Sequence, residues 1–221
     1  MGSNKTSPSF FNPKSLGTRI LTGLCNLIIV NLLFLLTSLP VITIGASITS
    51  LYRITIAILA GDNPSVWKDY LKCFKDNFVK ATLLELLYAG LTAFFLFEIF
   101  IVNNMLDSQY YWAQYPAYFF LLTIFASSVY AFPLLAWFEE SFKQLLKNSL
   151  LIAVTNLPVT IMVAAFTAGL AFLVYQFTVT TMSLMIFMGF SSFAFFYSIF
   201  FKRIFEKLGA EISFVEKEGR D

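Results

Sequence analysis

Long apolar runs alternate along the chain with short polar stretches. Six of these runs reach the roughly 20 residues that an α-helix needs to cross the hydrocarbon core of a bilayer. Leu39 and Pro40 interrupt the first apolar region and Gly45 follows, so the first two runs are expected to form a hairpin. The pattern predicts membrane spans at residues 16–39, 41–60, 81–106, 116–138, 150–175 and 181–201.

Two connections between the predicted spans have apolar residues on one helical face and charged residues on the other. These segments, residues 64–80 and 139–149, are typical of amphipathic helices that lie in the membrane interface. For the first segment, a solvated helix start that continues into the next span is an alternative. The residues of the two segments that are candidates for contact with a partner protein are Trp67, Lys72, Phe74, Lys75, Phe142, Lys143 and Lys147.

The fifteen lysine and arginine residues fall on one side of this six-span arrangement. They lie in a short N-terminal tail (1–15), at the start of the first span, in the inner half of the second, in the two amphipathic segments and in a charged C-terminal tail (202–221). Cytoplasmic loops carry an excess of Lys and Arg. Both termini are therefore expected in the cytoplasm.

The composition agrees with an all-α membrane protein, a six-transmembrane-helix bundle with two interfacial cytoplasmic helices. Hydrophobic residues make up 58% of the chain and the mean hydropathy is +0.75. The net charge of +2 is too small to indicate a nucleic-acid partner, and the expected partner is the lipid bilayer. The chain has no histidine, and Cys25 and Cys73 lack metal-ligand spacing, so no metal, cofactor or catalytic residue is expected.

Arg53 and Glu85 stand at similar depths in the second and third predicted spans. An isolated charge at the centre of a membrane helix costs roughly 2.5–3.5 kcal/mol, which favours pairing or exposure to a wet cavity. We therefore predict that Arg53 and Glu85 face each other. A salt bridge that fixes the two helices is the main interpretation, and snorkelling of Arg53 to the surface and a role in transport are the alternatives.

Glu98 lies deeper in the third span, among four phenylalanines and without a basic residue at the same depth. A proton-coupled carrier could use such a carboxyl group, but a structural hydrogen bond to Asn26, Asn31 or a backbone carbonyl is the simpler interpretation. Asn26 and Asn31 in the first span and Asn156 in the fifth are expected to form hydrogen bonds between helices.

Several short stretches carry a family resemblance. They are NLLF at residues 31–34, SLPVITIGA at 38–46, FKDNF at 74–78, YAFPLL at 130–135, and the KNS to LP segment at 147–158. Together they resemble the YesL-like family of bacterial integral membrane proteins, a domain of unknown function. The resemblance extends from about residue 16 to residue 201 and implies no catalytic residues. It implies a location in the bacterial cytoplasmic membrane and a link to carbohydrate utilisation and sugar ABC transporters.

These patterns lead to a functional hypothesis. We expect a non-enzymatic accessory or regulatory component of a bacterial carbohydrate uptake system of the ABC type, with sugar ABC-transporter subunits as partners. The alternative is a small secondary transporter or channel that uses Glu98 and the pair of Arg53 and Glu85. The break at Asn156-Leu157-Pro158 favours this alternative, because discontinuous helices line the substrate sites of carriers.

Overall fold

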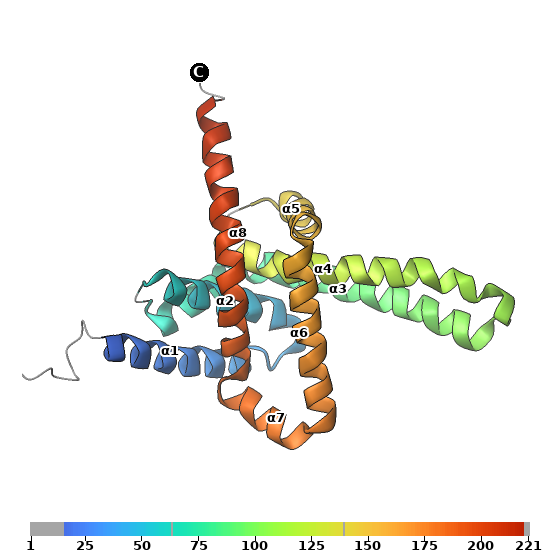
Figure 1. Ribbon diagram of the computed structural model, residues 1–221, viewed down its shortest axis with the longest axis horizontal. Coiled ribbons are helices and arrows are strands. Elements are labelled where there is room, and N and C mark those ends of the chain that lie inside the picture. The colour runs from blue at the N-terminus through green and yellow to red at the C-terminus, as the bar shows by residue number, and fades with distance from the viewer. Residues whose placement is uncertain (1–15, 63, 139, 219–221) are drawn as a thin grey trace, which may run out of the picture.

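A computed structural model describes residues 16–62, 64–138 and 140–218, and within these ranges every regular element is helical (Figure 1). The predicted tail 1–15 and the last residues of the C-terminal tail lie outside the described residues. η1 and η2 are 3-10 turns, and η3 is a π-helical turn. The elements are α1 (Leu16–Thr37), η1 (Val41–Thr43), α2 (Ile44–Ala60), α3 (Val66–Met105), η2 (Ser108–Ala113), α4 (Gln114–Trp137), α5 (Phe142–Thr155), α6 (Leu157–Gln176), α7 (Thr178–Leu184), η3 (Met185–Gly189) and α8 (Phe190–Glu218).

The predicted hairpin at the start of the chain is formed by α1 and α2. Three hydroxyl groups hold its turn: Thr43 Oγ1 donates to Thr37 O at 2.5 Å, and Ser47 Oγ donates to Thr37 Oγ1 at 2.9 Å. α2 ends at Gly61, whose φ of 86° belongs to the left-handed region that favours glycine at a helix end. The start of α2 is rich in small residues and is buried against its neighbours.

α3 is one continuous helix of 40 residues, so the separate interfacial helix predicted at residues 64–80 is not formed. The alternative, in which the charged segment continues into the next span, is the one that the structure adopts. At 1.5 Å per residue α3 is about 60 Å long, roughly twice the thickness of the hydrocarbon core of a bilayer. The whole of α3 therefore does not fit into a single crossing along the membrane normal.

Only the inner half of α3 (residues 66–88) packs against α2. The two helices are antiparallel: Val66 and Tyr70 share a core cluster with Leu51 and Ile54, and Gly45, near the start of α2, touches Ala81. The outer half of α3 (residues 89–105) extends past α2 and pairs with α4, and Figure 1 shows this hairpin projecting from the rest of the molecule. The second and third predicted spans are thus staggered along α3 and are not fully side by side.

The fourth predicted span agrees closely with α4, but the next two differ in their boundaries. The second amphipathic segment forms α5, which continues beyond the predicted end at residue 149 to Thr155. The fifth predicted span begins only after the break at Asn156, as α6. The sixth corresponds to α7, η3 and the first part of α8, and α8 continues as a helix into the predicted tail.

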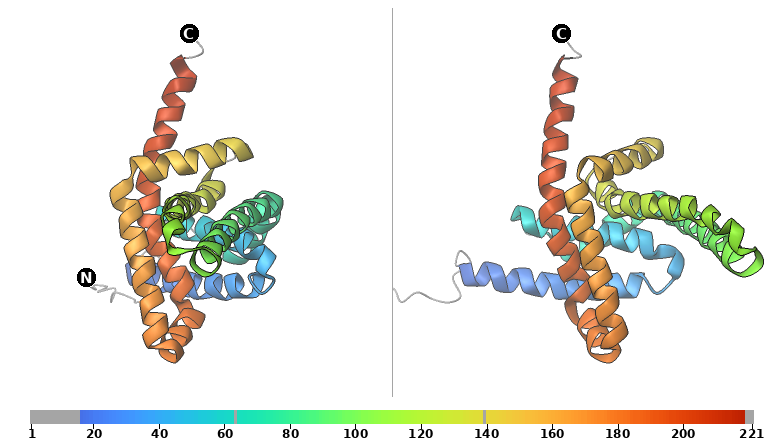
Figure 2. Two further views of the ribbon diagram at one scale, coloured as in Figure 1. Left: turned by 90° about the vertical axis from the view of Figure 1, so that its right-hand side faces the viewer. Right: turned by 45° about the vertical axis from the view of Figure 1, so that its right-hand side comes forward.

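The helices do not form one parallel bundle. Figures 1 and 2 show α6 and α8 side by side and steeply inclined to the α3–α4 hairpin, with α2 near the centre. By length and apolar composition, five helical stretches of the described chain can cross a membrane; α1 contributes a shorter apolar helix, Leu21–Thr37. The structure therefore agrees with an integral membrane protein, while its helix directions depart from the simple bundle that the sequence predicts.

Candidate functional site

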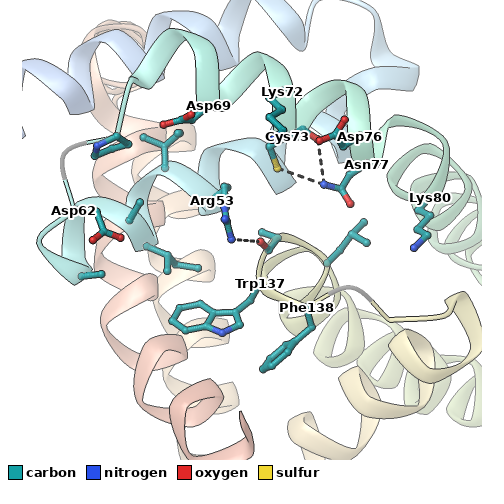
Figure 3. A pocket seen from close by; sticks show the side chains of 17 residues that line it. Arg53, Asp62, Asp69, Lys72, Cys73, Asp76, Asn77, Lys80, Trp137 and Phe138 are labelled. Atoms are coloured by element: carbon teal, nitrogen blue, oxygen red, sulfur yellow. Dashed lines mark hydrogen bonds between the residues drawn. The ribbon is translucent and has the colours of Figure 1, made fainter.

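A cleft of about 900 Å³ lies between the C-terminal half of α2, the inner half of α3 and the C-terminal end of α4 (Figure 3). Trp137 and Phe138 form part of its lining beside apolar residues of α2. The charges of its ionisable side chains balance, because three are basic and three are acidic. These side chains are Arg53, Asp62, Asp69, Lys72, Asp76 and Lys80.

Arg53 is exposed inside this cleft and reaches the end of α4. Its Nη1 donates to the carbonyl oxygen of Ala136 at 3.3 Å. Ala136 lies in the last turn of α4, where carbonyl groups have no partner within the helix and carry the negative end of the helix dipole. The guanidinium group thus helps to cap α4 and keeps most of its five N–H donors for other contacts.

The predicted ion pair between Arg53 and Glu85 is wrong. Glu85 Oε2 instead accepts a hydrogen bond from the backbone N–H of Gly45 at 2.8 Å. Gly45 is in the first turn of α2, where N–H groups lack a helical acceptor and favour a negative charge. The prediction failed because it placed the two spans fully side by side, whereas Glu85 lies at the start of α2, eight residues before Arg53 along that helix.

Gly45 also lies close to both α3 and α4. A Cβ atom on this residue would lie 2.7 Å from Ala81 O, 2.9 Å from Phe132 Cε1 and 3.1 Å from Glu85 Cβ. Distances this short are not tolerated without movement of the backbone of α3. The glycine therefore allows the Glu85 carboxylate to reach the start of α2.

Two of the charged side chains on the inner half of α3 already form hydrogen bonds within the protein. Asp69 Oδ2 accepts from Ser65 N at 2.8 Å and so stabilises the start of α3. Lys80 Nζ donates to Glu140 O at 3.1 Å and ties α3 to the segment before α5. Among the described residues, Lys72 and Asp76 have no hydrogen-bond partner, and they remain available in the cleft.

Glu98 is half-buried on the outer half of α3. In the part of the chain that the structure describes, neither Glu98 nor Asn26 makes a side-chain hydrogen bond. The predicted bond from Glu98 to Asn31 is not formed, because Asn31 is fully engaged elsewhere. Glu98 therefore has no structural partner in its own molecule within the described residues.

Asn31 joins the first helix to the π-helical turn η3. Its side-chain amide donates to Met185 O at 3.2 Å and to Ile186 O at 2.8 Å, and its Oδ1 accepts from Ser191 N at 3.0 Å. A π turn leaves backbone groups out of the regular i to i−4 ladder. The fully buried amide of Asn31 satisfies these groups, which is the interhelical role expected for it.

Asn156 does not form the predicted bond to a distant helix. Its Nδ2 donates locally to Ile152 O at 3.2 Å and to Thr155 Oγ1 at 3.1 Å, at the end of α5. Pro158 follows in the first turn of α6, the position that tolerates proline best. Asn156 therefore marks the corner at which the amphipathic helix α5 turns into the apolar helix α6.

The candidates for partner contact divide into two groups. Phe74 and Phe142 are partly buried and pack against the larger core cluster. Trp67 is 60% exposed at the start of α3. The exposed basic residues of the set are Lys72, Lys75, Lys143 and Lys147.

The sequence reading missed a chain of hydroxyl groups between α3, α4 and α5. Tyr88 OH lies 2.8 Å from Ser127 Oγ, which lies 2.9 Å from Ser149 Oγ. Tyr130 OH and Thr160 Oγ1 form a second link, 3.0 Å long, between α4 and α6. Polar residues in otherwise apolar helices were the available signal, since they commonly bond across helices.

Residues 27–99 match a protein family described as "Protein of unknown function, DUF624". Comparison with curated proteins and with solved structures gave no match. The matched segment includes α2 and most of α3, so it contains Arg53, Glu85 and the greater part of the cleft. About a third of the chain is thus similar to the DUF624 family. This part includes the second half of α1, its turn into α2, and the α2 and α3 walls of the cleft, and the match is consistent with the YesL-like resemblance.

Proposed function

We propose that this protein is a non-enzymatic accessory or regulatory component of a bacterial carbohydrate uptake system of the ABC type. In this proposal it lies in the cytoplasmic membrane with both termini in the cytoplasm, and it contacts a sugar ABC-transporter subunit. The observation that carries the proposal is the placement of α5, a basic surface helix held on the core by its apolar face.

α5 is built to keep its basic side exposed. Its start is fixed by a capping box, in which Ser141 Oγ lies 2.6 Å from Gln144 Oε1 and the Ser141 N–H donates to the same oxygen at 3.3 Å. Leu145 and Ile152 are buried against the core, whereas Lys143 remains exposed to solvent. A rigid helix with a basic outer face can recognise an acidic surface of a cytoplasmic partner.

The identity of the partner is inferred from the family resemblance and from the charge pattern of the chain. The YesL-like resemblance supports a link to carbohydrate uptake, and the DUF624 match over residues 27–99 supports membership of a related group of unknown function. The lysine and arginine pattern supports a cytoplasmic location for α5. These observations together favour a cytoplasmic or membrane subunit of a sugar transporter as the partner.

Affinity purification from the native membrane under sugar induction tests the proposal. We expect a transporter subunit to co-purify with the wild type, and its yield to fall about tenfold in the variant with Lys143→Glu and Lys147→Glu, as expected for the loss of more than one charge contact. Lys207→Glu, an exposed position on α8, is the matched control and should leave the yield unchanged. Absence of every transporter subunit from the wild-type sample would reject the proposal.

A small secondary transporter is the second candidate, and Glu98 is the observation that favours it. The carboxyl group is half-buried in a hairpin whose surface is rich in exposed phenylalanines, including Phe94, Phe97 and Phe100. The break at Asn156 supports this candidate less, because it separates a surface helix from α6 and does not interrupt a single span. Proteoliposome uptake that survives Glu98→Gln unchanged would remove the main support for a transporter.

A further inference from the structure

The cleft between α2, α3 and α4 has the size of a small-molecule site. Its volume of about 900 Å³ lies within the range of roughly 300–1,000 Å³ that is usual for ligand pockets. Its ionisable side chains have no net charge, because three bases face three acids. A polyanion would meet the carboxylates of the cleft, so its affinity would suffer from repulsion, and a ligand that carries both signs of charge fits better.

Arg53 supplies the positive side of the cleft. Arg53 lines the cleft, and its guanidinium group makes one hydrogen bond within the described residues, from Nη1 to Ala136 O at 3.3 Å. Arginine binds phosphate with two parallel hydrogen bonds, which gives both affinity and orientation. A single phosphate group is therefore the anionic part that suits this position.

Asp62 and Asp76 supply the negative side. In the view of Figure 3, Arg53 lies between these two carboxylates, with Asp62 on the connection after α2 and Asp76 on α3. Within the described ranges neither carboxylate has a hydrogen-bond partner, whereas Asp69 is used by Ser65. An ammonium group close to the phosphate of a ligand would satisfy one of these free carboxylates.

The remaining lining is apolar and aromatic. Ile54, Ile56 and Leu135 line the cleft together with Trp137 and Phe138. Tryptophan is enriched where headgroups meet hydrocarbon, because its ring is apolar and its N–H is polar. Such a lining suits the glycerol and the first methylene groups of a lipid attached to a headgroup.

We infer that the cleft binds a phosphoethanolamine group, the zwitterionic headgroup of phosphatidylethanolamine. Arg53 binds the phosphate, Asp62 or Asp76 binds the ammonium group, and the aromatic residues contact the adjoining lipid. The inference rests on the orientation in the proposed function, which puts the cleft at the cytoplasmic surface of the membrane. It does not depend on a transporter partner, because the cleft belongs to this chain alone.

Native mass spectrometry of the full-length protein tests the inference, with equal amounts of phosphatidylethanolamine and phosphatidylglycerol present in detergent. We expect the wild type to retain phosphatidylethanolamine in preference. Arg53→Gln should reduce the retained amount about tenfold, as expected for the loss of hydrogen bonds to a charged group. Lys207→Gln, at an exposed position on α8 outside the cleft, is the control and should retain the lipid as the wild type does.

Two further arms keep the test decisive. If Arg53→Gln does not fold, the double variant with Asp62→Asn and Asp76→Asn, both at exposed positions, should show the same loss of preference for phosphatidylethanolamine. Competition by free O-phosphoethanolamine at the concentration of the lipid would support the same chemistry with a soluble source, and competition by the lipid alone would support the membrane source. Equal or greater retention of phosphatidylglycerol by the wild type, or full retention by a folded Arg53→Gln protein, would overturn the inference.

Discussion

The inner and outer halves of α3 belong to one helix but have opposite surroundings. The inner half (residues 66–88) contributes six buried residues to the protein core, whereas Val102 is the one buried residue of the outer half (residues 89–105). The outer half is nevertheless the more apolar of the two, because Glu98 is its one charged residue, whereas the inner half carries seven charged residues. Apolar residues of the inner half pack against other helices, whereas most of those on the outer half are left exposed, as expected for a surface that meets lipid.

The two glutamates of α3 follow the same division. Glu85, on the inner half, bonds to the start of α2 through Gly45 N. Glu98, on the outer half, has no hydrogen bond within the described residues. A carboxyl group on the inner half is therefore structural, and the carboxyl group on the outer half is free for another role or another molecule.

The largest expected difference in stability comes from adding one methyl group at Gly45, which faces the inner half of α3, and one at Gly90, on the outer half. Gly45→Ala places a Cβ atom 2.7 Å from a backbone oxygen of the inner half, and we expect it to lower the free energy of unfolding by about 3 kcal/mol. Gly90→Ala, on the outer half, meets nothing within 4 Å and should be neutral or stabilising by up to about 1 kcal/mol, because alanine is the better helix former. Thermal unfolding of the two purified variants in detergent measures the contrast, and equal midpoints would disprove the close packing at Gly45.

Two adjacent serines on α4 test the hydroxyl network at the end of the inner half of α3, because only Ser127 bonds to Tyr88. Ser127→Ala removes the partner of Tyr88 OH and of Ser149 Oγ in a buried site, and should cost about 2 kcal/mol of stability. Ser128→Ala removes only a local bond to Phe125 O and should change stability by less than about 0.5 kcal/mol. The same thermal measurement applies, and a larger loss in Ser128→Ala would contradict the hydroxyl network.

Truncating the two glutamates should separate a structural carboxylate from a free one. Glu85→Ala removes a group that stabilises the first turn of α2, at a cost of about 1 kcal/mol. The free energy of unfolding of Glu98→Ala should stay within about 0.5 kcal/mol of the wild-type value.

The double variant with Arg53→Gln and Glu85→Ala should lose as much stability as the two single variants together, since the two residues do not pair. A coupling energy above about 0.5 kcal/mol would restore the ion pair that the sequence predicted.

Chemical labelling compares the surroundings of the two halves with little effect on stability. Val79 and Phe97 are similarly exposed, at 68% and 62%, but lie on different halves. In a background without Cys25 and Cys73, a water-soluble maleimide should modify Val79→Cys quickly and Phe97→Cys slowly, because thiolates do not form in hydrocarbon. Equal labelling rates in lipid nanodiscs would show that both halves meet the same medium.

The sequence predicted the helix boundaries well where turn residues mark them. Pro40 separates the first two helices, and the second predicted span ends with α2 at Ala60. The Asn156-Leu157-Pro158 segment, predicted as a break within the fifth span, is the boundary between α5 and α6. Fold class and membrane character followed from apolar runs for the same reason. These features depend on neighbouring residues, so they can be read directly along the chain.

The sequence failed where the outcome depends on how helices pack. Within the most apolar 18 residues of each segment, 50% are buried for Val41–Ala60, against 11% for α3 and 11% for α6, although the mean hydropathy of the first segment is only slightly lower. The stagger of α2 along α3 also decided the partners of Arg53 and Glu85, and no local pattern encodes that stagger. The π turn η3 was not predicted either, because its unpaired backbone groups are satisfied by a residue of the first helix.

That last contact has a consequence for the order of assembly during synthesis. The partners of Asn31 lie 154 to 160 residues later in the chain. At about 5–20 residues per second, a ribosome takes roughly 8 to 31 s to make the first of them. The amide must find temporary partners in water, lipid or the insertion machinery during this time. Docking of α1 onto η3 and the start of α8 is therefore a late step of folding, and it completes only after residues 185–191 have been made.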